Sequence, residues 1–142
     1  MVINRLIGIV LTIFLMVGCR HQNTASLNGW YIINDMNQIN GDAIFTKHDV
    51  DVIWLDSAYI GNTNTIVYEI AGKFKPEAAI RLSEFTEKNI GKKLGFVFNG
   101  EIITSPVIEQ KNDNGGFSII SIPLFTKKTE VLKIYENILI DY

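Results

Sequence analysis

The sequence predicts an α+β domain of two layers, in which a mainly antiparallel sheet of four to six strands carries two helices on one face. Three observations predict this fold class. Short runs rich in β-branched and aromatic residues alternate with turn signals, and two longer segments have helical periodicity. From residue 65 the order is strand, helix, strand, strand, strand, helix. Both helices can therefore cover the same face of the sheet.

The first strands are predicted at residues 30–34 (WYIIN) and 65–72 (TIVYEIAG), because both runs are rich in β-branched and aromatic residues. Between them, residues 35–42 are dominated by turn-forming residues. The alternating residues 49–54 indicate extended structure.

Two helices are predicted. The first spans residues 75–91, where Pro76 suits the first helical position and Gly91 provides a left-handed C-terminal cap. The second begins with Thr126 as its N-cap and continues to the end of the chain. Each has the apolar stripe expected of a helix packed on a sheet. The stripes are Ala78, Leu82 and Phe85 in the first helix, and Val131, Ile134, Tyr135, Ile138 and Leu139 in the second.

Residues 91–106 (GKKLGFVFNGEIITSP) predict a β-hairpin. Apolar residues alternate before Asn99-Gly100, which is the preferred pair for a two-residue type I′ turn. Pro106 indicates a bulge or an edge position, because proline cannot donate to a strand ladder. A loop at 111–116 and a strand at 117–125 complete the sheet.

The N-terminus has the parts of a secretory signal peptide, predicted at residues 1–18. Arg5 precedes an apolar run from residue 6 to residue 17, and the small Gly18 stands directly before Cys19. The apolar run is shorter than the roughly twenty residues that a membrane-spanning helix needs. A small residue followed by Cys resembles a bacterial lipobox, although Met16 departs from the usual Leu.

The lipobox resemblance implies that Cys19 carries a covalent lipid, the one attached group that we expect. The alternatives are an ordinary signal peptide, or an uncleaved anchor with an incidental Cys. Residues 19–29 are then a flexible tether, and residues 30–142 form a single domain. We expect an envelope protein anchored to the membrane through lipid. In a diderm host, Arg20 after the Cys resembles the default for sorting to the outer membrane, facing the periplasm. Otherwise the anchor lies on the outer face of the plasma membrane.

Composition excludes several classes of function. The chain has 13 basic and 15 acidic side chains, and neither sign forms a block, so we expect no nucleic-acid partner. Cys19 is the only Cys, so no internal disulfide is possible.

Catalytic and metal chemistry are also not expected. The densest polar cluster is His48, Asp49, Asp51 and Asp56, and on a strand Asp49 and Asp51 would face away from His48. A solvated strand edge or turn is the better interpretation of this cluster. None of Ser105, Ser118 and Ser121 has a His at a recognisable spacing, and there is no phosphate-binding glycine loop. We therefore predict no enzyme, no metal and no small-molecule substrate.

A set of short motifs between residues 76 and 126 identifies a family by its order and spacing. The motifs are Thr86, Asn89, Gly91-Lys92, Asn99-Gly100, Thr104-Ser105-Pro106, Gly115-Gly116 and a last helix that begins at Thr126. From about residue 44 onward the chain resembles the head subdomain of the large periplasmic domain of SecD, an accessory subunit of the Sec protein-export machinery. The sequence shows neither membrane-spanning segments nor the base subdomain that flanks the head in SecD. The resemblance therefore implies the fold and the ability to bind polypeptides, but it does not imply translocase activity.

The same signature residues also have structural explanations. Gly91 and Gly100 suit positive φ, and Gly115-Gly116 suits a loop that lets two strands meet.

Two hypotheses of function follow from the resemblance and the predicted anchor. The first is a binding module for exported polypeptides or envelope proteins, linked to protein export, which uses the exposed edge after Thr104 for strand addition. The alternative is a structural or protective envelope lipoprotein, such as the immunity partner of a toxin, that uses the fold as a scaffold.

Overall fold

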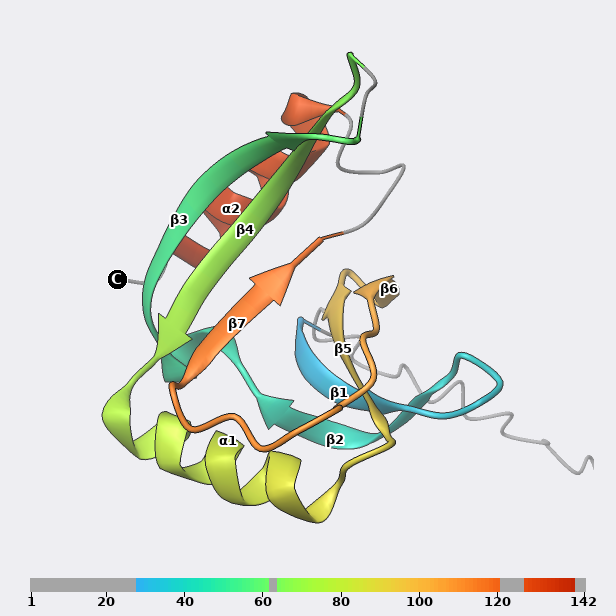
Figure 1. Ribbon diagram of the computed structural model, residues 1–142, viewed down its shortest axis with the longest axis vertical. Coiled ribbons are helices and arrows are strands. Elements are labelled where there is room, and N and C mark those ends of the chain that lie inside the picture. The colour runs from blue at the N-terminus through green and yellow to red at the C-terminus, as the bar shows by residue number, and fades with distance from the viewer. Residues whose placement is uncertain (1–27, 62–63, 121–126, 140–142) are drawn as a thin grey trace, which may run out of the picture.

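The computed structural model describes residues 28–61, 64–120 and 127–139 of the 142-residue chain. Figure 1 shows its strands and helices. The strands are β1 (Gly29–Ile33), β2 (Ile39–Phe45), β3 (Val50–Tyr59), β4 (Ile66–Phe74), β5 (Lys93–Phe98), β6 (Glu101–Thr104) and β7 (Gly116–Ile119). The α-helices are α1 (Pro76–Lys88) and α2 (Lys128–Leu139), and a 3-10 turn, η1 (Lys47–Asp49), separates β2 from β3.

All strand pairs are antiparallel, which confirms the predicted α+β class with antiparallel strands and two helices. The strands form two sheets, whereas the sequence predicted one. A four-stranded sheet has the order β2-β1-β5-β6, and a three-stranded sheet has the order β3-β4-β7. The described residues hold one strand, β2, that was not predicted. Its sequence INGDAIF begins with turn-forming residues, which hid the strand.

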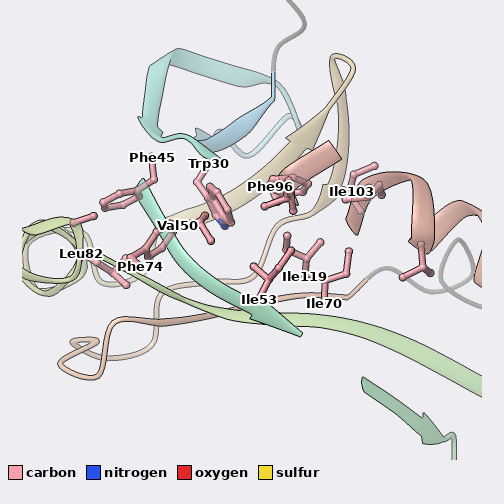
Figure 2. Close-up of a cluster of buried hydrophobic side chains, with 14 of the residues drawn as sticks. Trp30, Phe45, Val50, Ile53, Ile70, Phe74, Leu82, Phe96, Ile103 and Ile119 are labelled. Carbon is pink, nitrogen blue, oxygen red and sulfur yellow. The ribbon is translucent and has the colours of Figure 1, made fainter. Parts of the chain in front are cut away.

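One hydrophobic core lies between the two sheets, and both helices contribute to it (Figure 2). Trp30 of β1 is at its centre, with ring centroids 4.9 Å from Phe74, 4.8 Å from Phe96 and 4.8 Å from Phe117. Edge and tilted contacts of this kind add stability beyond the apolar area that the rings bury. Because these rings come from both sheets, the aromatic cluster fixes how the two sheets pack.

The two helices cover this core through most of their predicted apolar stripes, except that Leu139, at the end of α2, is exposed. In α1, Ala78 and Leu82 are buried. The buried residues of α2 are Val131, Ile134 and Ile138. Figure 1 shows α2 behind β3 and β4, and α1 across the end of the three-stranded sheet. Among the described residues, no helix is long and apolar enough to cross a membrane.

The hairpin of β5 and β6 forms as the sequence predicts. Asn99 and Gly100 have φ values of 51° and 81°, the two left-handed residues of a type I′ turn. Phe96 faces the main core, whereas Val97 faces the other side of the sheet. A register shift between these two residues places a bulge in β6, which is an edge strand.

A smaller apolar cluster lies on that other side of the four-stranded sheet, around Tyr31, Ile33 and Val97. Burial raises the pKa of the Tyr31 phenol, and the nearby Asp42 carboxylate adds to the increase.

Several sequence predictions fall outside the described residues. They concern the signal peptide, Cys19, residues 20–27 of the tether, Ser121 and the N-cap Thr126.

Candidate functional site: the cleft between the two sheets

Most of the signature residues lie on or beside residues 105–115, which we call the crossing segment, whereas Asn99-Gly100 form the turn between β5 and β6. The crossing segment leaves β6, passes α1 and leads into β7, and Figure 1 shows it as the orange loop beside these elements. Gly91, Lys92 and Thr86 contact it from the helix side, and Gly115 ends it. Most of the family motifs are therefore distant in sequence but meet around one loop.

Thr86 anchors the middle of the crossing segment to α1. Its side chain is the one buried polar side chain among the described residues, and it is 4% exposed. The Oγ1 hydroxyl donates to the Leu82 carbonyl at 2.8 Å and accepts the Asn112 backbone N–H at 2.8 Å. The hydroxyl therefore satisfies a backbone donor that would otherwise lose a partner on folding.

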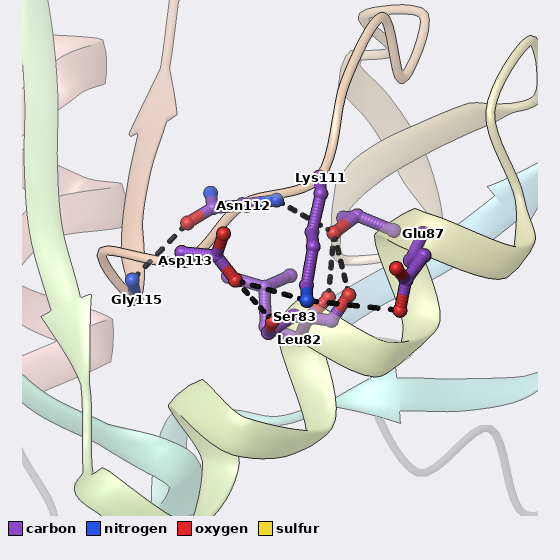
Figure 3. A network of polar contacts seen from close by, with 8 residues as sticks. Leu82, Ser83, Glu87, Lys111, Asn112, Asp113 and Gly115 are labelled. Atoms are coloured by element: carbon purple, nitrogen blue, oxygen red, sulfur yellow. Dashed lines mark hydrogen bonds and ion pairs between the residues drawn. The ribbon is translucent and has the colours of Figure 1, made fainter.

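Asn112, which Thr86 holds, in turn hydrogen-bonds the backbone at the start of β7 (Figure 3). Its Oδ1 accepts the Gly115 N–H at 3.1 Å, and its Nδ2 donates to the Gly116 carbonyl at 2.8 Å. Asn114 Oδ1 accepts the Gly116 N–H at 2.7 Å. Two asparagine side chains therefore occupy both backbone groups of Gly116.

Gly115 lets the crossing segment lie against α1. Its φ is +68°, and a Cβ added there would come within 2.7 Å of the Ala79 Cβ. A side chain at this position would therefore be disfavoured both by the backbone conformation and by steric overlap.

Exposed charges add a second link between the crossing segment and α1 (Figure 3). Ser83 Oγ donates to Asp113 Oδ1 at 2.6 Å, and this hydrogen bond lowers the pKa of the Asp113 carboxyl. Lys111 Nζ lies 3.5 Å from Asp113 and 3.7 Å from Glu87. Exposed pairs of this kind contribute little to stability, so the Thr86 anchor is the stronger of the two links.

The start of the crossing segment pairs with the beginning of β5. Leu94 N–H donates to the Pro106 carbonyl at 3.1 Å, and Ile108 N–H donates to the Lys92 carbonyl at 2.8 Å. Val107 lies opposite Lys93 between these two bonds. Because backbone groups alternate in direction along an antiparallel pair, the N–H and C=O of Val107 point away from β5.

The end of α1 holds this pairing in place. Asn89 Nδ2 donates to the Phe85 carbonyl at 2.8 Å, and Asn89 Oδ1 accepts from Lys92 Nζ at 2.8 Å. Gly91 has a φ of 87°, and its N–H donates to the Ile108 carbonyl at 2.8 Å. These signature residues end the helix and bind the crossing segment.

β7 presents an open edge on the other side. It pairs with β4 through Gly72 opposite Phe117 and Ile70 opposite Ile119, and Phe74 N–H donates to the Gly115 carbonyl. In this register the odd-numbered residues of β7 bond β4, so the backbone groups of Ser118 point to the free edge. β7 is an edge strand of its sheet in the described part of the chain.

A cleft of about 340 Å³ is lined by residues of both edges. Val107 and Ser118 are among these residues, and the apolar lining includes Trp30, Phe74 and Phe117. Polar residues of the crossing segment, among them Glu109 and Asn114, complete its wall. A volume of this size is at the low end of the range for ligand pockets. The cleft thus combines an apolar interior with backbone groups on two sides.

Thr104 and Ser105 do not line this cleft. Together with Ile39 and Ile102 they line a second depression beside β6, which is more open and has a volume of about 780 Å³. Of the edge residues named from the sequence, Pro106 lines the cleft.

The polar cluster of residues 48–56 has a structural role at Asp49. The Asp49 carboxylate pairs with Arg81 of α1, and its Oδ2 accepts the Thr46 N–H at 2.8 Å. Asp51 and Asp56 lie on β3. Within the described ranges, no three His, Cys, Asp or Glu side chains are grouped closely enough to hold a metal ion.

The sequence motifs did not predict a role for Asn112 and Asn114. The signal was present in the run NDNGG, since Asn side chains commonly hydrogen-bond backbone groups a few residues away in turns.

Residues 32–128 match a family model described as the SecDF P1 head subdomain. The protein translocase subunit SecD of Aquifex aeolicus is 37% identical over 62 residues, which cover 44% of this chain and 12% of that protein. The protein translocase subunit SecDF of Thermus thermophilus is 40% identical over 47 residues, covering 33% of this chain and 6% of that protein.

Two solved structures share the fold. One is of SecDF as a membrane component that enhances protein export, and the other is of SecDF in a super-membrane-facing form. Each has a TM-score of 0.52 and 24% sequence identity over 70% of this chain. The matches cover 44% and 13% of those chains. The chain therefore spans less than half the length of each relative.

Proposed function

Because the chain belongs to the family of the SecDF P1 head subdomain, we propose that it is a non-enzymatic binding module of the cell envelope, linked to protein export. Its ligand is an extended polypeptide, either an exported chain or a segment of an envelope protein. The binding site is the cleft between the two sheets. The lipid on Cys19 holds the module at the membrane through the tether. The tether is shorter than the predicted residues 19–29, because Gly29 belongs to β1 and Asn28 hydrogen-bonds Asn99 and Asn137.

One observation carries this proposal. The cleft is lined by residues of two open strand edges, at Val107 and at Ser118, and its interior is aromatic. Backbone edges recognise a polypeptide through groups that every residue has, and an aromatic lining accepts apolar side chains of many shapes. A module that meets many different unfolded chains needs both properties.

Photo-crosslinking in cells tests the binding function. The full chain carries p-benzoyl-phenylalanine at Val107, which is exposed and lines the cleft. The matched control carries it at Ile80, which is exposed on α1 and does not line the cleft. We expect position 107, but not position 80, to trap unfolded exported chains or components of the export machinery. Equal crosslinking from both positions, with a probe shown to react, would overturn the proposal in favour of a scaffold role.

The anchor needs its own test, because it does not depend on the cleft. Cells expressing the chain are labelled with a palmitate analogue, and the Cys19→Ala variant is the control. We expect labelling that disappears in the variant, and separation of the membranes then locates the labelled chain. Labelling that persists without Cys19 would contradict the lipid anchor.

A further inference from the structure

The two edges that flank the cleft have the hydrogen-bonding groups of a missing strand. Ser118 belongs to the three-stranded sheet, and Val107 is paired with the first strand residues of β5 in the four-stranded sheet. At both positions the N–H and C=O point away from the strand already paired, by the alternation of antiparallel ladders. Both residues line the same cleft.

We propose that the cleft takes a single extended polypeptide segment as an added β-strand, bonded to Ser118 on one side and to Val107 on the other. The segment then joins the two sheets into one. This inference rests on the proposed function and adds the mode of recognition, which is through the backbone of the bound segment.

The structure also sets where this pairing begins. The N–H and C=O of Gly116 already bond Asn114 and Asn112, so an incoming strand finds the edge of β7 closed at that residue. The next outward-pointing residue is Ser118, which is exposed. The added strand therefore starts at Ser118 and continues toward Ile120, away from α1.

The side chains of the ligand follow from the two-residue period of a strand. Positions beside Phe117 and Ile119 point into the core side of the sheet, where Trp30 contacts Phe117. Positions beside Ser118 point to the outer face, where the Ser118 hydroxyl bonds Glu69. The preferred ligand class is thus an unfolded segment with apolar residues at every second position and no proline where its N–H must donate.

Binding of a chemically unfolded protein tests the inference. The full chain is purified in detergent, and the probe is fluorescein-labelled, reduced and carboxymethylated α-lactalbumin. Ser118→Pro removes the outward N–H and leaves the bonds between β7 and β4, because the Ser118 N–H does not take part in them. Its matched control, Ser118→Ala, keeps the N–H and removes the hydroxyl. Val107→Pro and Val107→Ala form the corresponding pair on the other edge.

We expect each proline variant to weaken binding about tenfold, as the loss of one hydrogen bond at a desolvated site predicts. The alanine variants should stay within about threefold of the parent chain. Amide hydrogen exchange by NMR provides a readout that needs no variant. The amides of Ser118 and Val107 should exchange more slowly once the probe binds, whereas the outward-pointing amide of Leu55 on the edge strand β3 should not change.

The outcomes separate the two levels of the proposal. If the probe binds but neither proline variant weakens it and neither amide is protected, strand addition is wrong and polypeptide binding stands. Protection at Ser118 without Val107 overturns insertion between two edges. If the probe does not bind the parent chain at all, the proposed function fails, and this inference fails with it.

Discussion

Replacement of Gly115 by Ala tests the contact between the crossing segment and α1. The φ of +68° costs an L side chain about 1–2 kcal/mol, and the new Cβ would lie 2.7 Å from the Ala79 Cβ. Relief of such an overlap in a packed region costs a further 1–3 kcal/mol or so. Gly100→Ala is the matched control, because φ there is +81° and nothing lies within 4 Å of the added Cβ. We expect Gly115→Ala to be less stable than Gly100→Ala by about 1–3 kcal/mol.

A double-mutant cycle isolates the overlap from the backbone term. Ala79→Gly removes the atom that the new Cβ would meet, at a cost of about 1 kcal/mol for glycine in a helix. The Gly115→Ala, Ala79→Gly double variant should therefore lose less free energy of unfolding than the two single variants lose together, and the difference should be about 1–3 kcal/mol. Urea unfolding of the four chains, followed by circular dichroism, measures each free energy of unfolding. Strict additivity would refute the reasoning, because it would mean that Gly115 does not approach α1.

Three further predictions concern groups that the structure places in defined hydrogen bonds or burial. Thr86→Val should lower the free energy of unfolding by about 1–3 kcal/mol and speed the hydrogen exchange of the Asn112 amide. Thr86→Ser keeps the hydroxyl, so it should leave that exchange unchanged. The raised pKa of Tyr31 means that the unfolded chain loses this proton first, so stability falls as pH rises above about 10. Urea midpoints between about pH 9 and pH 11 should therefore fall less in Tyr31→Phe, and an equal fall would contradict this. Ser83→Ala should raise the pKa of Asp113 toward its ordinary value in carboxyl NMR titrations, and an unchanged pKa would show that Ser83 is not the cause.

Local signals in the sequence predicted much of the fold. The helix from Pro76, the type I′ turn at Asn99-Gly100 and the stripe of α2 each depend on residues close to one another along the chain. Such features are set by backbone preference and by helical period, so a single sequence is enough to find them.

The division into two sheets was not predictable in the same way. The pairing of β1 with β5, and of β4 with β7, joins segments that are far apart in the sequence. A period of two shows which side of a strand is apolar but not which strand lies beside it. Tertiary packing around Trp30 decides this, because its ring contacts Phe96 of one sheet and Phe117 of the other.

The candidate site was only partly predictable for a related reason. The sequence motifs named Thr86, Pro106 and Gly115-Gly116, and the structure brings all of them to the crossing segment. The cleft itself depends on where the backbone groups of Val107 and Ser118 point. That direction follows from the strand register, and the register cannot be predicted from the side chains in the sequence.

The scaffold and binding roles of the signature residues are therefore not exclusive, and they make different predictions. Thr86 lines the cleft and Gly115 does not, and both residues fix the crossing segment that carries Val107. Variants at these positions should lower stability and binding together. Ser118 contributes an edge that the fold does not use, so its proline variant should lower binding with little change in stability. A pure scaffold would respond only to the first kind of change, and a binding module must respond to both.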